Sequence, residues 1–368
     1  MKVLVNAGPW LPVPPHGYGG IENVVATLVP ELRRLGVQVV LATVGDSDLP
    51  VDERLAVFGT GQFGSLQRPY NQVCGIVPAH QNALVRRLSE GDIDLIHDHV
   101  EAAGLATLAA LGPDAPPALH TLHWDLAKHP ELYGTFDGGS RVRVNGVSAD
   151  QLSHAPPALR AHAVGHVHLA SPLATGADRR PPVAKQGYVV VLGRINAGKG
   201  QDLAARLAHE AGFDLVLAGP VGPCHRPPDL AAADPQNPDV RFWHDRVAPH
   251  VDGDRVRWVG TVTGRDRDDL VAGARAALFP LRWNEPGGTA VVESLALGTP
   301  VVGTARGCLP ELVDHGRTGL LTTDEQALGD LVHQAVSIAE GECRAEAARR
   351  FTPAVMAAAY LELYKGIS

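Results

Sequence analysis

Cysteine and lysine are scarce in this sequence, and their scarcity excludes several classes of protein. Four cysteines occur in 368 residues, far apart and without a C-x-x-C pair: Cys74, Cys224, Cys308 and Cys343. This spacing argues against a disulfide framework or a zinc-ligand pattern, and it is typical of a reducing cytoplasm. There are five lysines, and the formal net charge of −8 argues against general nucleic-acid binding, for which a basic face is expected.

Long hydrophobic runs are also absent. No stretch approaches the roughly 20 apolar residues that a membrane-spanning helix needs, and the opening run Met1–Gly8 is too short for a signal peptide. We therefore expect a cytoplasmic protein without integral membrane contact. The hydrophobic content of 45% and the charged content of 20% are ordinary for globular proteins, and the chain is long enough for two domains.

The first half of the chain alternates strand and helix patterns. Val3–Ala7 is a short apolar run, Gly8–Gly20 is a loop rich in proline and glycine, and Ile21–Leu35 has apolar residues at helical spacing. With the apolar run Val37–Thr43, this order is the opening of a doubly wound α/β domain. Four further strands are predicted in this half, at Ile93–His97, Ala118–Leu122, Val142–Val147 and Val164–Leu169.

A polar, proline-rich stretch at 171–186 is predicted to be a linker, and a second α/β pattern follows it. We expect two Rossmann-like domains, residues 1–170 and 187–350, facing each other across a deep cleft. A final helix at 351–368 is expected to return to the first domain, and residues 223–249 are expected to be irregular. The second pattern predicts strands at Tyr188–Leu192, Phe213–Ala218, Val256–Val259, Ala276–Pro280 and Val301–Thr304, and helices at Gly200–Ala211 and Gly288–Leu297.

The segment Phe279–Gly303 carries the most informative chemical pattern. Pro286 suits a first helical position, and the glycines Gly287 and Gly288 let a ligand approach the backbone. The amides of these glycines and of Thr289 would point at a phosphate above the helix start, where the helix dipole favours negative charge.

Two glutamates, Glu285 and Glu293, flank this helix start. A helical rise over eight residues separates them by at most roughly 12 Å, which is on the order of the span from ribose to sugar across a diphosphate. Carboxylates are pure acceptors and suit hydroxyl donors. We expect one glutamate to bind the sugar and the other the ribose; the alternative is an ordinary helix start with a solvent-facing Glu293.

Two glycine-containing turns supply further candidates. Gly193 and Arg194 end a predicted strand, and Lys199 follows at a helix start, so that two cations could neutralise a departing diphosphate. The alternative is two exposed basic residues near a turn. Gly19 and Gly20 open a helix after the first strand, and their amides could contact the same phosphate.

Together these motifs resemble the retaining glycosyltransferases of the GT-B fold, family four. The family's E-x7-E signature followed by G-x-P-V-V matches E285-PGGTAVV-E293 and G298-TPVVG. Its G-R-x4-K-G element matches residues 193–200, its G-G-x-E element matches residues 19–22, and a later glycine-rich element matches Gly307–Leu321. The matches span nearly the whole chain in the family's order. The segments PPHGYGGIE and GTARGCLPEL are similar to bacterial members that modify antibiotics and other natural products.

The resemblance implies a role for each matched residue. Arg194 and Lys199 would neutralise the diphosphate, while Glu285 would bind the transferred sugar and Glu293 the ribose. Backbone groups of the loops at 219–222 and 260–263 would hold the base. The implied donor-binding set is Gly19, Gly20, Gly193, Arg194, Lys199, Gly219, Val262, Glu285, Pro286, Gly287, Gly288, Thr289 and Glu293.

A histidine of the first domain completes the catalytic set in this family. The best match is His123, just past a predicted strand, and it joins Arg194, Lys199 and Glu285 as a predicted catalytic residue. His120 is the second choice, because it lies within an apolar run. A metal cluster of His97, His99, His120 and His123 is an alternative, but we expect no metal, because the strand pattern explains these residues without requiring them to converge.

The implied reaction moves a hexosyl-type sugar from a nucleotide diphosphate, UDP or GDP, to a hydroxyl of a small-molecule acceptor with retention and without a cofactor. Alternatives are a lipid- or polysaccharide-directed transferase, an epimerase or phosphorylase of the same plan, and a nucleotide-sugar-binding protein without turnover. The sequence departs from the family beside Glu285: Gly287 replaces a common aromatic, and Trp283 and Asn284 replace a Pro-Ser pair. Because these departures lie in the expected sugar pocket, the resemblance does not predict the identity of the donor sugar.

Overall fold

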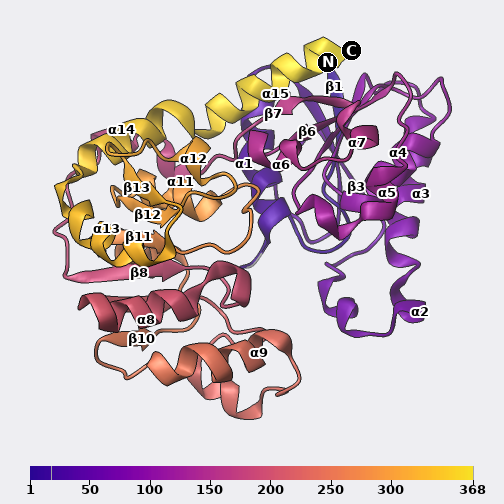
Figure 1. Cartoon of the computed structure of the whole chain (residues 1–368). Helices are drawn as coiled ribbons and strands as arrows, with labels where there is room; N and C mark the ends of the chain where they lie inside the picture. Colours follow the sequence, from indigo (N-terminus) through magenta and orange to yellow (C-terminus); the bar gives the residue numbers. More distant parts are fainter. Residues whose placement is uncertain (18, 368) are drawn as a thin grey trace. The chain divides into compact units, whose positions relative to one another are not determined.

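The computed structural model of the chain describes residues 1–17 and 19–367 and divides into two compact units (Figure 1). Unit 1 comprises Met1–Ala170 and the carboxyl-terminal stretch from Pro353, and unit 2 comprises Ser171–Thr352. The predicted linker at 171–186 belongs to unit 2, where Ala174 and Ala177 are fully buried in the core. None of the described helices is long and apolar enough to cross a bilayer.

Unit 1 is built on a seven-stranded sheet in which every recorded strand pairing is parallel, in the order β3-β2-β1-β4-β5-β6-β7. Its central strands are rich in valine, leucine and isoleucine and are buried on both faces, as parallel sheets require. The strands are β1 (Lys2–Asn6), β2 (Gln38–Thr43), β3 (Glu53–Ala56), β4 (Leu95–Asp98), β5 (Ala118–Thr121), β6 (Val142–Gly146) and β7 (Ala163–His166).

Alternate residues of these strands pack into two separate layers. Val3 and Val5 of β1 share a core with α1 and α15, whereas Leu4 shares a core with α3 and α4. The final helix α15 packs on α1, and its Tyr360 and Tyr364 are fully buried. The helices of unit 1 are α1 (Gly20–Arg34), α2 (Tyr70–Val73), α3 (Ile76–Leu88), α4 (Glu101–Ala110), α5 (Pro130–Gly134), α6 (Ala149–Ser153), α7 (Pro157–Arg160) and α15 (Pro353–Ile367).

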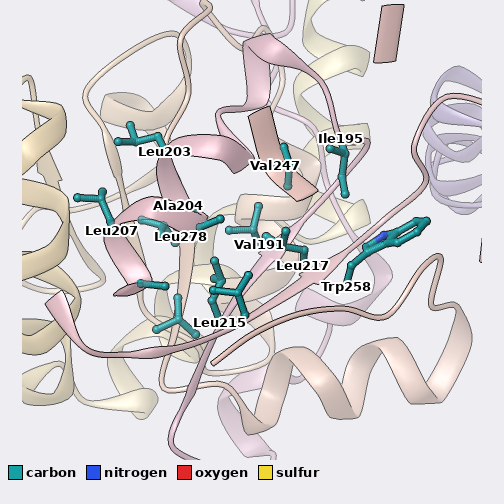
Figure 2. Close-up of a cluster of buried hydrophobic side chains, with 14 of the residues drawn as sticks. Val191, Ile195, Leu203, Ala204, Leu207, Leu215, Leu217, Val247, Trp258 and Leu278 are labelled. Atoms are coloured by element: carbon teal, nitrogen blue, oxygen red, sulfur yellow. The ribbon is translucent and has the colours of Figure 1, made fainter. Parts of the chain in front are cut away.

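Unit 2 contains a six-stranded parallel sheet in the order β10-β9-β8-β11-β12-β13. Figure 2 shows Val191 of β8 and Leu215 of β9 packed with Leu203 of α8 in one of its cores. The strands are β8 (Tyr188–Leu192), β9 (Asp214–Ala218), β10 (Val256–Trp258), β11 (Ala276–Phe279), β12 (Val301–Thr304) and β13 (Gly319–Thr322), and the helices are α8 (Gln201–Ala211), α9 (Pro238–Phe242), α10 (Gly264–Gly273), α11 (Thr289–Ala296), α12 (Leu309–Leu312), α13 (Leu328–Gln334) and α14 (Glu340–Arg350).

The prediction of two Rossmann-like α/β halves is confirmed, but residues 223–249 differ from expectation. This stretch, predicted to be irregular, forms four short helical segments, including α9 and a π-helical turn at Trp243–Val247. Prolines obscure the helical pattern in the sequence, yet three of the four segments have proline in their first two positions, where its missing N–H costs little. Val240, Trp243 and Val247 are buried in the core of unit 2.

Candidate active site

The predicted donor residues of unit 2 follow the carboxyl ends of its strands. The strand order reverses at β8, which has β9 on one side and β11 on the other. In open α/β sheets, ligands bind outside the carboxyl ends of the strands at such a switch point. Arg194 follows the end of β8, and Glu285 follows the end of β11. The topology therefore places the two groups on neighbouring strands at this point.

Lys199 and Glu285 form an ion pair between the Lys199 ammonium and Glu285 Oε2. The Lys199 amide donates a 3.1 Å hydrogen bond to the Asn196 side chain, which caps the turn η5 (Ala197–Lys199). The ammonium also lies 5.3 Å from the centre of the Trp283 ring, a cation–π contact. The residue that departs from the family's Pro-Ser pair thus contacts the predicted phosphate-binding lysine.

The turn after β12 holds the backbone of Glu285. The Cys308 amide donates to the Glu285 carbonyl at 2.9 Å. Gly307 has a φ of 57°, and a Cβ at this position would lie 2.3 Å from the Glu285 nitrogen. Only glycine allows this approach in this conformation, so the position of Glu285 depends on a segment more than 20 residues further along the chain.

The helix between the two glutamates begins later than predicted. α11 starts at Thr289, with Gly288 as its N-cap residue at a φ of 60°. The prediction that Pro286 stands at a first helical position is therefore wrong, because the left-handed backbone at Gly288 separates Pro286 from the helix. A Cβ on Gly288 would lie 2.7 Å from Cys308 Sγ, so this glycine is required by packing and conformation. Gly287 is buried in the same turn.

Glu293 is paired with Arg267 of α10, a residue that was not among the predicted donor residues. The two side chains are only 20% and 19% exposed, so Glu293 is not a freely solvated residue. Burial raises the pKa of the Glu293 carboxyl, while Arg267 and a hydrogen bond from Ser171 act in the opposite direction. No local sequence signal marks Arg267, because it lies 26 residues away on a different helix.

Arg194 differs from Lys199 in that its side chain is exposed. It forms no ion pair with any residue in the described part of the chain. Its backbone is fixed nonetheless: the Arg194 carbonyl accepts from the Gln201 side chain at 2.9 Å, and Gly193 has a φ of 140°. Of the two predicted donor-site cations, Lys199 is therefore paired with a carboxylate, and Arg194 forms no ion pair with residues 1–17 and 19–367.

The loops predicted to hold the base lie together at the ends of β9 and β10. The Gly219 amide donates to the Gly260 carbonyl at 2.8 Å, and the Trp258 indole donates to the Gly219 carbonyl at 2.8 Å. The amide of Gly219 is thus already engaged, and only a second lone pair of its carbonyl is left for a base. Val262 is half-buried and packs against a core of unit 2.

In unit 1, His123 follows the end of β5 and is partly buried. Its Nε2 lies 2.9 Å from Nδ1 of His99, and its amide donates to Glu101 at 2.9 Å. Burial lowers the pKa of His123 to about 3, so the ring is neutral near pH 7. The sequence predicts no role for Glu101, and it names His99 only as a member of the alternative metal cluster.

The second-choice histidine, His120, is fully buried on β5. Its Nδ1 lies 2.6 Å from Asp98, whose other oxygen accepts from Asn6 at 2.6 Å. His97 is also fully buried and uses both ring nitrogens, one with Thr121 at 2.8 Å and one with Tyr364 at 2.6 Å. The four histidines of the metal alternative therefore have protein partners for at least one nitrogen each.

The helix start after β1 contains Gly19, Gly20 and the buried Glu22. A Cβ on Gly19 would lie 2.6 Å from Pro15, whereas a Cβ on Gly20 would meet no atom within 4 Å. Packing therefore explains the first glycine but not the second.

Glu22 predicts a pH dependence of stability. Burial raises the pKa of its carboxyl from 4.5 to about 7. A raised folded-state pKa gives stability that is fully present below about pH 4.5 and is lost as the pH rises through 7. Glu22→Gln should therefore gain roughly 2–3 kcal/mol relative to the parent between pH 4.5 and pH 8. Urea unfolding at both pH values measures this difference; the exposed Glu362→Gln is the control, and an equal difference at both pH values would contradict the assignment.

Comparison with known proteins assigns both units to one class. Residues 177–352, in unit 2, match the family described as glycosyl transferases group 1, and residues 18–145, in unit 1, match glycosyltransferase family 4. A D-inositol 3-phosphate glycosyltransferase of Actinosynnema mirum is 29% identical over 82% of this chain and 80% of its own length. Another, of Jonesia denitrificans, is 28% identical over 64% of this chain, which spans 61% of that relative's length.

Solved structures show the same architecture. AviGT4, a glycosyltransferase involved in avilamycin A biosynthesis, is 26% identical with a TM-score of 0.64, and the match covers 99% of this chain and 97% of AviGT4. HepE of Anabaena, solved in complex with UDP and glucose, shares the fold at 18% identity and a TM-score of 0.64, over 100% of both chains. The chain therefore belongs to the GT-B glycosyltransferases, with a family 4 domain in unit 1 and a group 1 glycosyl transferase domain in unit 2.

Proposed function

We propose that this glycosyltransferase moves a hexosyl-type sugar from a UDP donor to a hydroxyl of a small-molecule acceptor, with retention and without a metal ion. The observation that carries the proposal is the charge arrangement at the β8–β11 switch point. Arg194 follows β8, and Lys199, in the turn η5 just before α8, pairs with Glu285, which follows β11. In the proposal these two cations and the amides at the start of α11 bind the diphosphate, while Glu285 precedes that helix and Glu293 lies within it.

The chemistry follows from these groups. The acceptor oxygen attacks the anomeric carbon, the bond from that carbon to the phosphate oxygen breaks, and the acceptor proton passes to the departing phosphate. The negative charge that develops on the diphosphate is stabilised by Arg194, Lys199 and the amides at the start of α11. These fixed positive groups take the place of a divalent cation. Attack from the side of the departing phosphate gives retention.

Glu285 and Glu293 recognise the two ends of the donor. The backbone carbonyl of Glu285 accepts from the Cys308 amide, and its carboxylate accepts hydrogen bonds from hydroxyls of the sugar. Glu293, whose carboxylate is paired with Arg267, accepts hydrogen bonds from hydroxyls of the ribose. In this proposal His123 contacts the transferred sugar, the role that the resemblance to the family implies.

The comparisons support the donor and the acceptor class. HepE was solved with UDP and glucose, and UDP is the nucleotide part of the donor that we propose here. AviGT4 serves the biosynthesis of an antibiotic, and a natural-product hydroxyl is the acceptor class we propose.

Binding and turnover with a panel of nucleotide sugars test the proposal. We expect UDP-hexoses, and not the matching GDP-sugars, to bind and to be hydrolysed slowly without acceptor, at a rate that added EDTA does not change. Tight binding without hydrolysis or transfer to any acceptor would instead identify a nucleotide-sugar-binding protein. Loss of activity with EDTA, restored by a divalent cation, would refute the metal-independent reaction.

A matched pair of glycine substitutions tests the start of α1. Gly20→Ala introduces a methyl group where no protein atom lies within 4 Å, so the melting temperature should be unchanged or raised. Turnover should nevertheless fall if a phosphate approaches this amide. Gly19→Ala should lower the melting temperature, because its Cβ would lie 2.6 Å from Pro15. Full turnover in Gly20→Ala would remove this helix start from the site.

A further inference from the structure

Two histidines that follow adjacent strands of unit 1 are linked by one hydrogen bond. His99 comes directly after β4 and His123 follows β5. Nδ1 of His99 lies 2.9 Å from Nε2 of His123, and the two rings are stacked with centroids 5.2 Å apart. Burial lowers the pKa of both imidazoles, to about 3 for His123, so both rings are neutral. One proton is therefore shared by the two facing nitrogens, and the tautomers of the rings are coupled.

His99 is held in place from the opposite side. Its amide donates to the Asn6 carbonyl at 3.0 Å, and its ring centroid lies 4.1 Å from that of His97. Because Thr121 donates its hydroxyl proton to Asn145, it must accept from His97 Nε2. The neutral His97 then accepts from the Tyr364 hydroxyl at 2.6 Å. A directed set of buried hydrogen bonds, reaching from α15, thus fixes the ring against which His99 packs.

The backbone of His123 is fixed independently of its ring. Its amide donates to Glu101 Oε1, and Tyr133 donates to the other Glu101 oxygen at 3.2 Å. With the backbone restrained by Glu101, the remaining freedom of His123 is the rotation and tautomer of its imidazole. The contact with His99 is the hydrogen bond that controls both.

The buried end of His99 decides the direction of the shared proton. His99 Nε2 is buried and has no hydrogen-bond partner among the described residues. A buried N–H without a partner is rarer than a buried acceptor without one, so Nε2 carries no proton. The proton of neutral His99 then lies on Nδ1 and is donated to His123 Nε2. His123 must carry its own proton on Nδ1.

We propose that His99 is a positioning residue that holds His123 in the Nδ1–H tautomer, so that His123 presents an N–H donor to an oxygen of the sugar. The contact with the sugar rests on the proposed function, whereas the tautomer does not. Nδ1 of His123 makes no hydrogen bond within residues 1–17 and 19–367. The hydrogen bond made by one ring nitrogen of a histidine sets which nitrogen carries the proton, and catalytic bases are commonly oriented by such a third group.

The test combines histidine ¹⁵N NMR with kinetics on the full chain. His99→Leu removes the donor, whereas His99→Asn keeps an amide N–H close to the position of Nδ1. We expect the parent and His99→Asn to show His123 protonated on Nδ1, and His99→Leu to shift His123 to the Nε2–H form. In His99→Leu, kcat should fall roughly 10-fold, with His99→Asn restoring most of the loss. The exposed His154→Leu is the control for adding leucine to unit 1.

The outcomes separate this inference from the proposed function. An Nε2–H tautomer of His123 in the parent, or an unchanged tautomer in His99→Leu, would overturn the positioning role. A shifted tautomer with unchanged kcat would uphold that role and remove His123 from the sugar contact. A fall in kcat that His99→Asn does not restore, with the tautomer unchanged, would show a merely structural effect and would also overturn the proposal.

Discussion

Replacing Arg194 or Lys199 with alanine is expected to lower kcat by about 10²- to 10³-fold, the range found when one donor to a developing negative charge is removed. A departing diphosphate gains charge as the bond to the sugar breaks. The two cations act on this charge more strongly than on the intact donor, so the loss should fall on kcat more than on donor affinity. Initial rates over a range of donor concentrations measure both quantities.

The two variants should differ in stability. Arg194 is exposed and forms no ion pair with a described residue, although its charge opposes the raised pKa of Asp239, so Arg194→Ala should change the melting temperature little. Lys199→Ala leaves the Glu285 carboxylate without its cation in a site where it is only 17% exposed. A loss of about 1 kcal/mol in unfolding free energy is expected, which is the upper end of the range for ion pairs near the surface. Lys199→Gln, which can donate a hydrogen bond to Glu285, should recover part of this stability and little of the activity.

Arg206→Ala provides the control, because Arg206 is an arginine of unit 2 that pairs with Glu210 along α8 and takes no part in the proposed site. It should change neither kcat nor the melting temperature. If Arg194→Ala and Lys199→Ala both kept near-normal turnover, the diphosphate site at the β8–β11 switch point would be wrong. A loss confined to KM would mean that the cations bind donor and transition state equally.

The order of strands and helices could be predicted from the sequence because most elements have strong local patterns. The runs that became β1, β2 and β8 are apolar and bounded by glycine or proline, and the helical spacing of α1 is regular. The edge strand β3 lacked such a pattern: it has four residues, two of them charged, and none is fully buried. The sequence between 223 and 249 does not distinguish helix from loop, because proline is common both in loops and in the first turn of a helix, where three of these four segments have it.

The donor motifs could also be located from sequence, since they combine glycine, charge and fixed spacing along the chain. Their partners could not. Arg267 pairs with Glu293 from another helix, and the turn at Gly307 and Cys308, which follows the neighbouring strand β12, contacts the backbone of Glu285. His99 had been considered only as a member of a metal cluster, because its contact with His123 depends on the pairing of β4 with β5. Such contacts depend on register and topology, which no local pattern contains.

The structure adds one feature that the motifs did not suggest: each of the two predicted glutamates is paired with a cation, and in one pair, Lys199 with Glu285, both members are predicted ligand-binding residues. Glu285 holds Lys199, and Glu293 holds Arg267. A diphosphate bound by Lys199 must compete with the Glu285 carboxylate, and it is also repelled by that charge. Glu285 therefore opposes the binding of a nucleotide diphosphate while its acceptor oxygens favour the sugar. The same side chain should have opposite effects on the two ligands.

Glu285→Gln is expected to tighten the binding of free UDP by about 2- to 5-fold and to lower kcat/KM for the UDP-sugar by roughly 10- to 100-fold. UDP binds the Glu285→Gln variant more tightly because it no longer has to disrupt the ion pair between Lys199 and Glu285. The free energy of that pair, about 0.5–1 kcal/mol, sets the size of the increase in affinity. The loss reflects the weaker hydrogen bonds that a neutral amide accepts from sugar hydroxyls compared with a carboxylate. Calorimetry with UDP and initial rates with the UDP-sugar measure the two effects separately.

The control is Glu325→Gln, because Glu325 is a carboxylate of unit 2 that lies 3.6 Å from an arginine, Arg282, and takes no part in the proposed site. It should change neither quantity. Weaker UDP binding in Glu285→Gln would show that Lys199 does not exchange Glu285 for the diphosphate. Unchanged kcat/KM would instead place the sugar away from Glu285. Because the two ligands test opposite consequences of one charge, the substitution distinguishes a carboxylate that binds sugar from one that only orients Lys199.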